Sequence, residues 1–216
     1  MQIVIEHLEP CISKWLFKEY EFVSNLFGGR VIFTNIKNDK DAQLLKPLGK
    51  VYRESATTLF SNNTNVIVLD PVAKEALTTN DLRDSKYVII GGIMGSHPPS
   101  GRTRKLITSK LPLAKVRNIG KHQYTIGGAA YIVKLIENGK KLEEIKYVFG
   151  LKINKKLGHD IELEIELPYA FPIDDVGNIV LPQDYIAIVA EFSPVYEARI
   201  LAGDDNICKY EDDKVY

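Results

Sequence analysis

Short apolar runs alternate with amphipathic stretches along residues 1–145, and this alternation limits the possible folds more than any other feature. The pattern is typical of α/β proteins whose strands form a mostly parallel sheet. The expected strands are residues 2–6, 31–34, 66–69, 86–90 and 114–118, with a short one around Val51. The expected helices are residues 13–26, 39–48, 101–109 and 124–137, with a helical turn at 55–60 and a turn capped by Thr79 or Asn80. Ser13 and Thr125 are the expected caps of two of these helices.

The pattern changes after residue 145, where two stretches, 147–153 and 161–167, alternate like strands of a small appended sheet. Glu162, Glu164 and Glu166 share one face of the second stretch. A solvated acidic face is the simpler interpretation, and an acidic surface that meets a basic partner is the alternative. The expected parts are an α/β domain over residues 1–145, appended strands and a helix packed on it over residues 146–193, and an acidic tail over residues 194–216.

Charge and cysteine content limit the classes of partner. The chain carries 28 basic and 28 acidic residues, so no global field attracts nucleic acid or an anionic membrane. This balance disfavours a dedicated RNA binder, but it leaves room for a local basic patch. Cys11 and Cys208 share no CxxC spacing, and two reduced thiols are favoured over a disulfide. The four histidines lack metal-ligand spacing and no apolar run reaches a membrane span, so we expect a soluble, cytoplasmic protein without a metal.

The most glycine-rich strand end is the segment 91–99, Gly-Gly-Ile-Met-Gly-Ser-His-Pro-Pro. Its three glycines let the backbone approach a ligand closely, and its paired prolines stiffen the exit. Ligands of open parallel sheets bind beyond the carboxyl ends of the strands, where this segment is expected to lie. The spacing is not GxGxxG, so it gives no support to a dinucleotide fold. A tight structural loop explains the segment as well as a cofactor site does, and His97 alone is more typical of a hydrogen-bonded loop histidine.

Two other strand ends carry polar or small residues. In residues 118–130, the small side chains of Gly127 to Ala130 allow a helix to pack closely against either protein or cofactor. After the first strand, Glu6, His7 and Glu9 combine two carboxylates with an imidazole, which suits a general base or a cation clamp. An exposed polar loop is the alternative for these three residues.

These segments occur together, in this order, in one known family. The sequence resembles the SPOUT methyltransferases, and within them the branch of the fungal ribosomal-protein arginine methyltransferase and its archaeal relatives. The similarity runs from residue 1 to about residue 189, and its most specific part joins Gly-Gly-Ile-Met-Gly to Pro-Pro-x-x-x-Arg-Thr. The other motifs are Ile5-Glu6-His7, Trp15, Glu19-Tyr20, Leu69-Asp70-Pro71, Gly120 with Gln123 and Thr125, Glu166-Leu167-Pro168-Tyr169 and Leu181-Pro182.

The resemblance implies a parallel α/β sheet whose later part is threaded into a deep trefoil knot, with residues 112–137 passing through a loop of the preceding strands. It also implies that S-adenosylmethionine, converted to S-adenosylhomocysteine, binds bent among three loops. A Gly92→Val change is accordingly expected to block the cofactor without unfolding the chain. The residues implied in cofactor binding are Leu69, Pro71, Gly91, Gly92, Ile93, Gly95, His97, Pro98, Ile119, Gly120, Gln123, Tyr124 and Thr125.

For an arginine acceptor, the resemblance makes carboxylates the central requirement. A guanidinium keeps its proton up to a pKa of about 13.8, so carboxylates must orient it and accept the proton that transfer releases. Glu6, Glu9 and Asp70 are the catalytic candidates because they follow strand ends at the expected cleft. Arg102 and Arg104 are expected to contact the cofactor carboxylate or the substrate backbone.

The favoured partner is a ribosomal protein, and two alternatives stay open. An RNA methyltransferase would use the same cofactor but would gather cations at the mouth of the cleft, and a non-catalytic binding module could keep the knot alone. The chain is expected to act as a monomer or as a homodimer formed through the knot. The cations that could form an RNA-binding patch are Lys105, Lys110, Lys115, Arg117, Lys121 and Lys134.

Overall fold

The computed structural model describes residues 1–95, 98–156 and 162–192. Its centre is a six-stranded sheet in the order β3-β2-β1-β5-β4-β6, in which every pair of neighbours is parallel. The predicted mostly parallel α/β architecture is therefore confirmed. The strands are β1 (Gln2–His7), β2 (Val31–Thr34), β3 (Lys50–Val51), β4 (Val66–Leu69), β5 (Tyr87–Gly92) and β6 (Lys115–Arg117).

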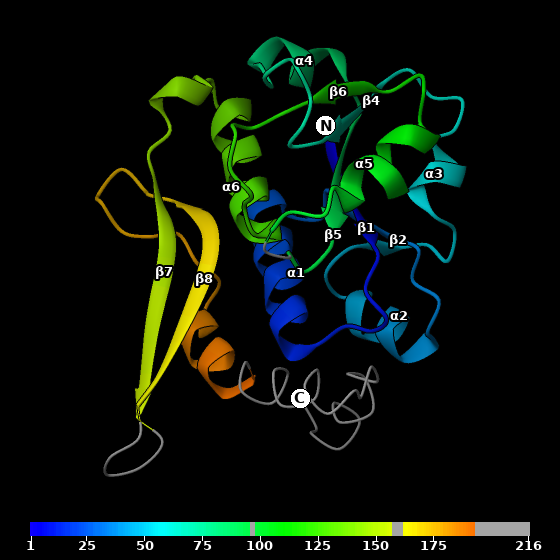
Figure 1. Ribbon diagram of the computed structural model, residues 1–216. Coiled ribbons are helices and arrows are strands. Elements are labelled where there is room, and N and C mark those ends of the chain that lie inside the picture. Colours follow the sequence, from blue (N-terminus) through cyan, green and yellow to red (C-terminus); the bar gives the residue numbers. More distant parts are fainter. Residues whose placement is uncertain (96–97, 157–161, 193–216) are drawn as a thin grey trace.

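Helices cover both faces of this sheet (Figure 1). They are α1 (Lys14–Phe27), α2 (Asp39–Leu45), α3 (Ala56–Leu59), α4 (Thr79–Asp84), α5 (Arg102–Leu106), α6 (Ile126–Glu137) and the 3-10 turns η1 (Thr108–Lys110) and η2 (Leu142–Glu144). Successive strand residues point to opposite faces. Ile3 and Ile5 therefore share a core with α1 and α6, whereas Val4 shares the opposite core with α3 and with Ile107, which follows α5.

The helix caps explain where several elements begin. Ser13 accepts a hydrogen bond from Leu16 N and Thr125 accepts one from Gly128 N, which confirms both as caps of α1 and α6. The expected cap of α4 was wrong by one or two residues. Thr78 is the cap, because its hydroxyl and the carboxylate of Asp81 form a reciprocal capping box.

Two boundaries differ from the sequence prediction near the glycine-rich segment. Strand β5 does not end at Ile90 but continues through Gly91 and Gly92, which pair in parallel with Glu6 and His7 of β1. The single helix expected over residues 101–109 is divided into α5 and η1. The first difference matters for function, because it places the second glycine inside the sheet.

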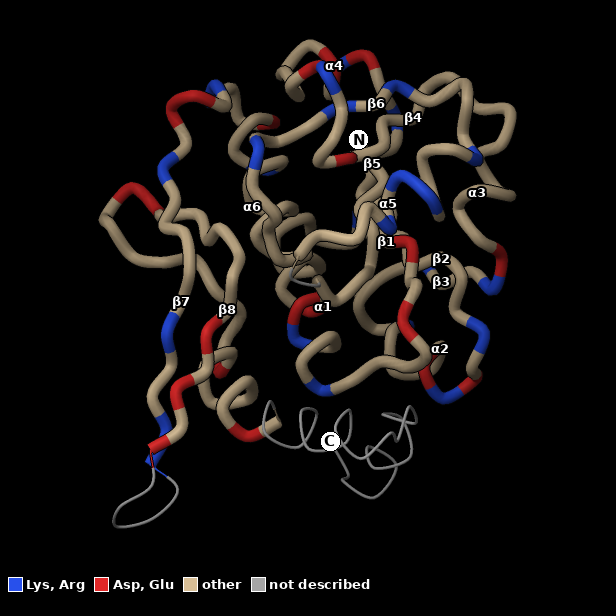
Figure 2. The backbone as a smooth tube through the Cα atoms, in the orientation of Figure 1, with Lys and Arg blue, Asp and Glu red and all other residues tan. Residues whose placement is uncertain are grey.

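A long antiparallel hairpin, β7 (Tyr147–Lys156) and β8 (Glu162–Pro172), stands beside α6 (Figure 1). Its apolar side packs against helical residues 185–192 and Trp15. On its charged side, Lys152 pairs with Glu164 at 3.0 Å and Lys156 with Glu162 at 3.8 Å. In Figure 2 blue lies along β7 and red along β8, so this side is a mixed surface rather than an acidic one.

The base of the hairpin is bonded to both glycine-bearing loops. Ala170 N donates to the carbonyl of Gln123 at 2.8 Å, and the hydroxyl of Tyr169 donates to the carbonyl of Gly95 at 2.9 Å. Residues 146–192 thus help to hold the loops that follow β5 and β6. The division at residues 145 and 193, the trefoil knot and the oligomeric state stay predictions, and residues 194–216 lie outside the described residues.

Cys11 takes part in a disulfide, so the expectation of two reduced thiols was wrong for this residue. Cys208 lies outside the described residues. Among the helices of the described ranges, none combines the length and the apolar character that a membrane crossing needs. The same part of the chain holds no group of three or more His, Cys, Asp or Glu side chains placed to bind a metal ion.

Candidate active site

A cavity of about 350 Å³ lies beyond the carboxyl ends of β4, β5 and β6. This volume is within the roughly 300–1,000 Å³ of small-molecule sites, and the place is where open parallel sheets bind ligands. Residues drawn from four stretches form its wall: 69–72, 90–93, 99–104 and 119–129. The predicted residues that line it are Leu69, Asp70, Pro71, Gly91, Ile93, Arg102, Ile119, Gly120, Gln123, Tyr124 and Thr125.

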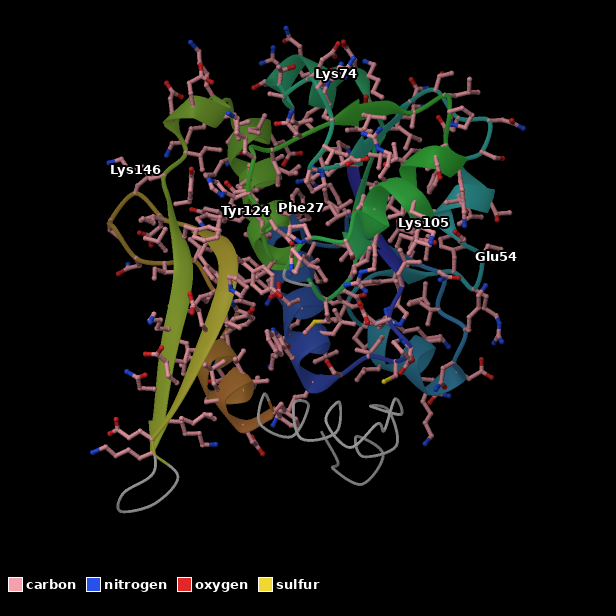
Figure 3. All side chains as sticks on the ribbon, in the orientation of Figure 1. Phe27, Glu54, Lys74, Lys105, Tyr124 and Lys146 are labelled. Atoms are coloured by element: carbon pink, nitrogen blue, oxygen red, sulfur yellow. The ribbon has the colours of Figure 1, made fainter. Side chains whose placement is uncertain are left out.

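The lining divides into an apolar part and a polar rim. Aliphatic side chains suit the flat, weakly polar face of an adenine, and backbone groups of the loops can bond its edge. Figure 3 shows Tyr124 where α6 and the hairpin approach each other. The aliphatic lining consists of Leu69, Ile90, Ile93, Ile119, Ile126 and Ala129. Arg104, which was expected at the site together with Arg102, also lines the cavity, whereas Val72, Ser100 and Thr103 join the wall without having been predicted.

Gly120 makes the turn between β6 and α6. Its φ of +109° lies where only glycine is comfortable, and its N–H donates to Asn118 Oδ1 at 3.0 Å. The turn brings the following residues to the cavity wall, so glycine is needed here because the backbone has a positive φ.

Asp70 lines the cavity, but both oxygens of its carboxylate accept hydrogen bonds from neighbouring residues. Its Oδ2 accepts from Arg104 Nε at 2.6 Å and from Thr108 Oγ1 at 2.7 Å, and its Oδ1 accepts from Val72 N at 3.0 Å. The carboxylate is buried, whereas the Arg104 side chain is half exposed. The geometry therefore makes Asp70 the residue that fixes Arg104 at the cavity rim.

Glu9, which follows β1, and Arg102, at the start of α5, form a second unit that holds Met94 in the loop after β5. Glu9 Oε1 accepts from Met94 N at 2.8 Å and from Arg102 Nη1 at 3.3 Å, and Arg102 also donates to the carbonyl of Met94. Burial raises the pKa of Glu9, and the Met94 amide and the Arg102 charge oppose that rise. Arg102 lines the cavity and Glu9 does not, so Glu9 reaches the site through its partner.

Glu6 is placed differently from the expectation. It shares the face of Val4, and its carboxylate accepts from Thr34 Oγ1 at 2.6 Å, from Ser55 Oγ at 2.5 Å and from Ala56 N at 2.8 Å. The residue is 1% exposed and does not line the cavity. The strand alternation turns this carboxylate toward the start of α3, where it satisfies three donors.

A Glu6→Gln variant is therefore expected to lose stability and to keep its chemistry. An amide cannot accept all three bonds with full charge, and the loss of charge-assisted bonds costs about 1.5–3 kcal/mol. Thermal unfolding should show a clearly lower Tm, with turnover per folded molecule unchanged. An unchanged Tm combined with lost turnover would instead restore the predicted catalytic role.

The glycines at the end of β5 and just after it have different roles. Gly91 lines the cavity, but a Cβ on Gly92 would meet the hydroxyl of Tyr20 and the backbone oxygen of Glu6, so Gly92 is a packing glycine. A Cβ on Gly95 would meet Gln123 and Tyr169, so this glycine also serves packing between loops. Gly92, Gly95 and Pro98 do not line the cavity, contrary to expectation, and His97 lies outside the described residues.

Next to the main cavity lies a buried carboxylate that was not predicted as a site residue. Glu19 of α1 is 2% exposed, and its Oε2 accepts from Gly127 N at 2.5 Å in the first turn of α6. Burial raises the pKa of Glu19 to about 7, and the hydrogen bond from Gly127 N, together with the nearby hydroxyls of Tyr185 and Thr125, only partly opposes this rise. A neighbouring imidazole, His7, bonds Tyr20 at 2.9 Å, and burial lowers its pKa to about 4.

The sequence model of the family described as "Protein arginine N-methyltransferase SFM1-like" matches residues 2–194. The chain belongs to this SFM1-like family. The protein arginine N-methyltransferase SFM1 of Saccharomyces cerevisiae is 26% identical over 210 residues, which cover 89% of this chain and 96% of the yeast protein.

Solved structures agree with the assignment to the SFM1-like family. Yeast SFM1 complexed with SAM superposes with a TM-score of 0.77 at 25% identity, covering 89% of this chain and 91% of that one. The complex with SAH gives 0.75 at 25% identity, with 87% and 94% covered. A dual-specific Trm10 from Thermococcus kodakaraensis gives 0.50 at 21% identity, with 66% and 96% covered, and shows the shared fold. The fold of this SFM1-like chain is that of the SPOUT methyltransferases.

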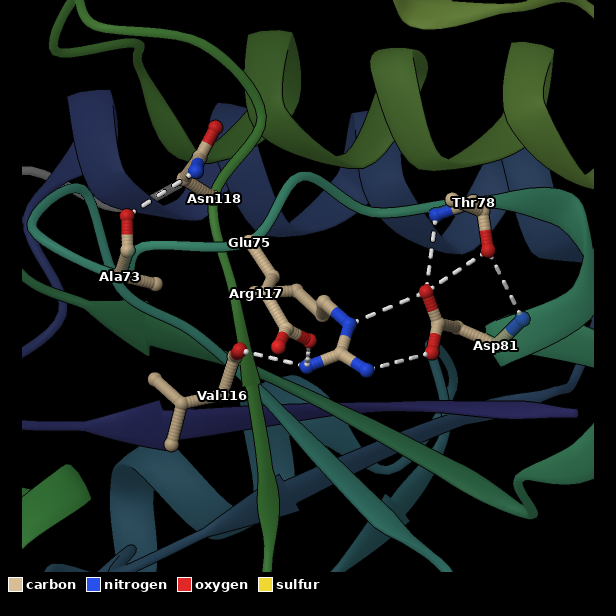
Figure 4. A network of polar contacts seen from close by, with 7 residues as sticks. All are labelled: Ala73, Glu75, Thr78, Asp81, Val116, Arg117 and Asn118. Atoms are coloured by element: carbon tan, nitrogen blue, oxygen red, sulfur yellow. Dashed lines mark hydrogen bonds and ion pairs between the residues drawn. The ribbon is translucent and has the colours of Figure 1, made fainter.

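Some cations that could form an RNA-binding rim in this SFM1-like protein are engaged elsewhere. Arg117 donates from Nε and Nη2 to Asp81 at 3.0 and 2.9 Å and pairs through Nη1 with Glu75 at 2.7 Å (Figure 4). Lys134 pairs with Glu137 at 2.9 Å. These two side chains fasten β6 and α6 to their surroundings, so the predicted basic patch is reduced.

Proposed function

We propose that this chain transfers the methyl group of S-adenosylmethionine to an arginine of a ribosomal protein. Membership of the SFM1-like family is the observation that carries the proposal. The cavity beyond β4, β5 and β6 supports it, because its size and its aliphatic wall fit a nucleoside cofactor. The ribosomal substrate rests on the branch that the sequence resembles, and it would place the activity in the cytoplasm.

When bound, the cofactor supplies an activated methyl group for an in-line displacement. The protein then has to hold the acceptor in line, exclude water and accept a proton. The apolar wall excludes water, and Arg102 and Arg104 at the rim can bind a carboxylate. Asp70 and Glu9 hold these two arginines in place, and a fixed guanidinium binds a carboxylate through paired hydrogen bonds.

The experiment incubates the pure protein with methyl-labelled S-adenosylmethionine and ribosomal subunits, and then separates RNA from protein. We expect the label in one ribosomal protein, and hydrolysis of that protein should release labelled methylarginine. Label in the RNA fraction would replace the proposal with RNA methylation. A cofactor that binds without any transfer to either fraction would favour a binding module.

A further inference from the structure

Glu19 is a buried carboxylate without a role in the cofactor site. A small space of about 20 Å³ lies in front of it, and aromatic side chains from three parts of the chain surround this space: Trp15 of α1, Tyr124 before α6, Tyr169 of β8, and Tyr185. The ring centroids of Trp15 and Tyr185 lie 5.8 Å apart in a T-shaped arrangement. Guanidinium groups bind both carboxylates and aromatic faces, so this combination suits an arginine side chain.

The hydroxyl of Tyr185 gives an independent sign of a missing ligand. Tyr185 is 2% exposed, and within the described residues its hydroxyl makes no hydrogen bond of normal geometry. Glu19 and Trp15 are near enough to affect its pKa, which burial raises strongly, but the bond itself is not formed. A buried hydroxyl left without a partner is costly, and a ligand that brings a donor or acceptor would remove this cost.

The small space adjoins the cofactor cavity. Ile93, Tyr124, Thr125 and Ile126 line both, so a group held in front of Glu19 lies one layer of side chains away from the cavity. An acceptor nitrogen must reach the methyl group from a position beside the cofactor, and this position adjoins it.

We propose that Glu19, Tyr185 and the rings of Trp15 and Tyr169 form the pocket that receives the guanidinium of the substrate arginine. The proposal rests on the proposed function. In the closed structure the space holds about one water molecule, so a guanidinium enters only when the wall moves apart. The contact that has to open is the bond from the Tyr169 hydroxyl to the carbonyl of Gly95.

The chemistry of transfer suits a carboxylate in this position. The bond between the methyl carbon and sulfur breaks as the bond to the guanidine nitrogen forms, and the sulfonium becomes a neutral thioether. The nitrogen loses one proton, which the Glu19 carboxylate accepts and passes to water. A carboxyl whose pKa is near neutrality is well matched to this exchange.

The test compares Glu19→Gln with Glu21→Gln. Glu21 lies on the same helix in a partly exposed pair with Lys18, which makes it a matched control. With an arginine-containing ribosomal protein as substrate, Glu19→Gln should lower kcat/KM about ten- to a hundredfold, while Glu21→Gln changes it less than twofold. The affinity for S-adenosylmethionine should stay within about twofold of wild type in both variants. Equal kcat/KM for Glu19→Gln and wild type would overturn the pocket.

A pH profile separates this role from a purely structural one. The titratable groups that face Glu19 are Tyr20 on its own helix, Tyr169 on β8 and Tyr185, and these stay protonated near neutral pH. The wild-type rate should therefore rise with pH through the ionisation of Glu19, and this acidic limb should vanish in Glu19→Gln. A retained limb would contradict the assignment.

Tyr185→Phe keeps the proposal testable should Glu19→Gln not fold. It removes only an unpaired hydroxyl, so folding should be unaffected and kcat/KM should fall about tenfold. An unchanged kcat/KM in a folded Tyr185→Phe protein would contradict the pocket. If the wild-type protein methylates arginine and both variants have the wild-type kcat/KM, only the proposed guanidinium pocket is wrong. If the wild-type protein methylates no protein, the proposed function is wrong as well.

Discussion

A Gly92→Val variant is expected to lose its folded state, not merely its cofactor. The first added carbon would meet the hydroxyl of Tyr20, the backbone oxygen of Glu6 at 2.9 Å and Ile5 Cγ2 at 3.0 Å. Tyr20 cannot easily withdraw, because it is fully buried and bonded to His7. Overpacking a core costs about 1–3 kcal/mol, and a collision with sheet backbone adds to that.

Soluble yield and thermal unfolding measure this effect, with Gly91→Ala as the control. A Cβ on Gly91 would meet only the side-chain ends of Ile93 at 3.2 Å and Ile107 at 3.5 Å, which can shift. We therefore expect Gly91→Ala to fold and Gly92→Val to be insoluble or strongly destabilised. A Gly92→Val protein with the wild-type Tm and no cofactor binding would support the original sequence prediction instead.

The second large effect concerns the pH dependence of stability. The folded state raises the pKa of Glu19 from 4.5 to about 7, so between these values the native chain binds more protons than the unfolded chain. Stability from this group is therefore fully present below about pH 4.5 and is lost as the pH rises through 7. Ionised Glu19 at pH 8 should cost on the order of 2–3 kcal/mol, and Glu19→Gln should remove that cost.

Thermal unfolding of both proteins at pH 5 and pH 8 tests this. The advantage of Glu19→Gln should be small at pH 5 and reach roughly 4–10 °C in Tm at pH 8. His7, whose pKa burial lowers, gives the opposite slope between about pH 4 and 6.5, but it is present in both proteins and cancels in the difference. An advantage that does not change with pH would show that Glu19 is not buried as a carboxyl with a raised pKa.

Periodicity predicted the strands well because each apolar run has one structural explanation. Val66–Leu69 is buried throughout, and a run this short, rich in β-branched residues and bounded by turn residues, favours a strand of a covered sheet over a helix. The positions of the loops near the cavity could also be predicted, because the carboxyl ends of parallel strands must lie at one edge of the sheet.

Glu6 and Gly92 were misplaced because their surroundings are formed by segments that lie far from them in the sequence. Glu6 turned away from the cavity because Val4 and Glu6 share a face, and only the strand order says which helices cover it. Gly92 could not be told from a ligand-contacting glycine until Tyr20 was placed above it. Glu19 carried a usable signal, since Leu16, Glu19, Tyr20 and Val23 follow the spacing of a buried helical stripe. A buried carboxylate on such a stripe either caps a neighbouring helix or belongs to a functional site.

Hydrogen exchange with and without S-adenosylhomocysteine tests the central claim most directly, because it reads all parts of the cavity wall in one unmodified protein. We predict slowed exchange in residues 69–72, 90–95 and 119–129, and no change in α2 or in the part of the hairpin furthest from α6. Protection confined to other segments, or no protection at saturating ligand, would contradict the placement of the cofactor beyond β4, β5 and β6.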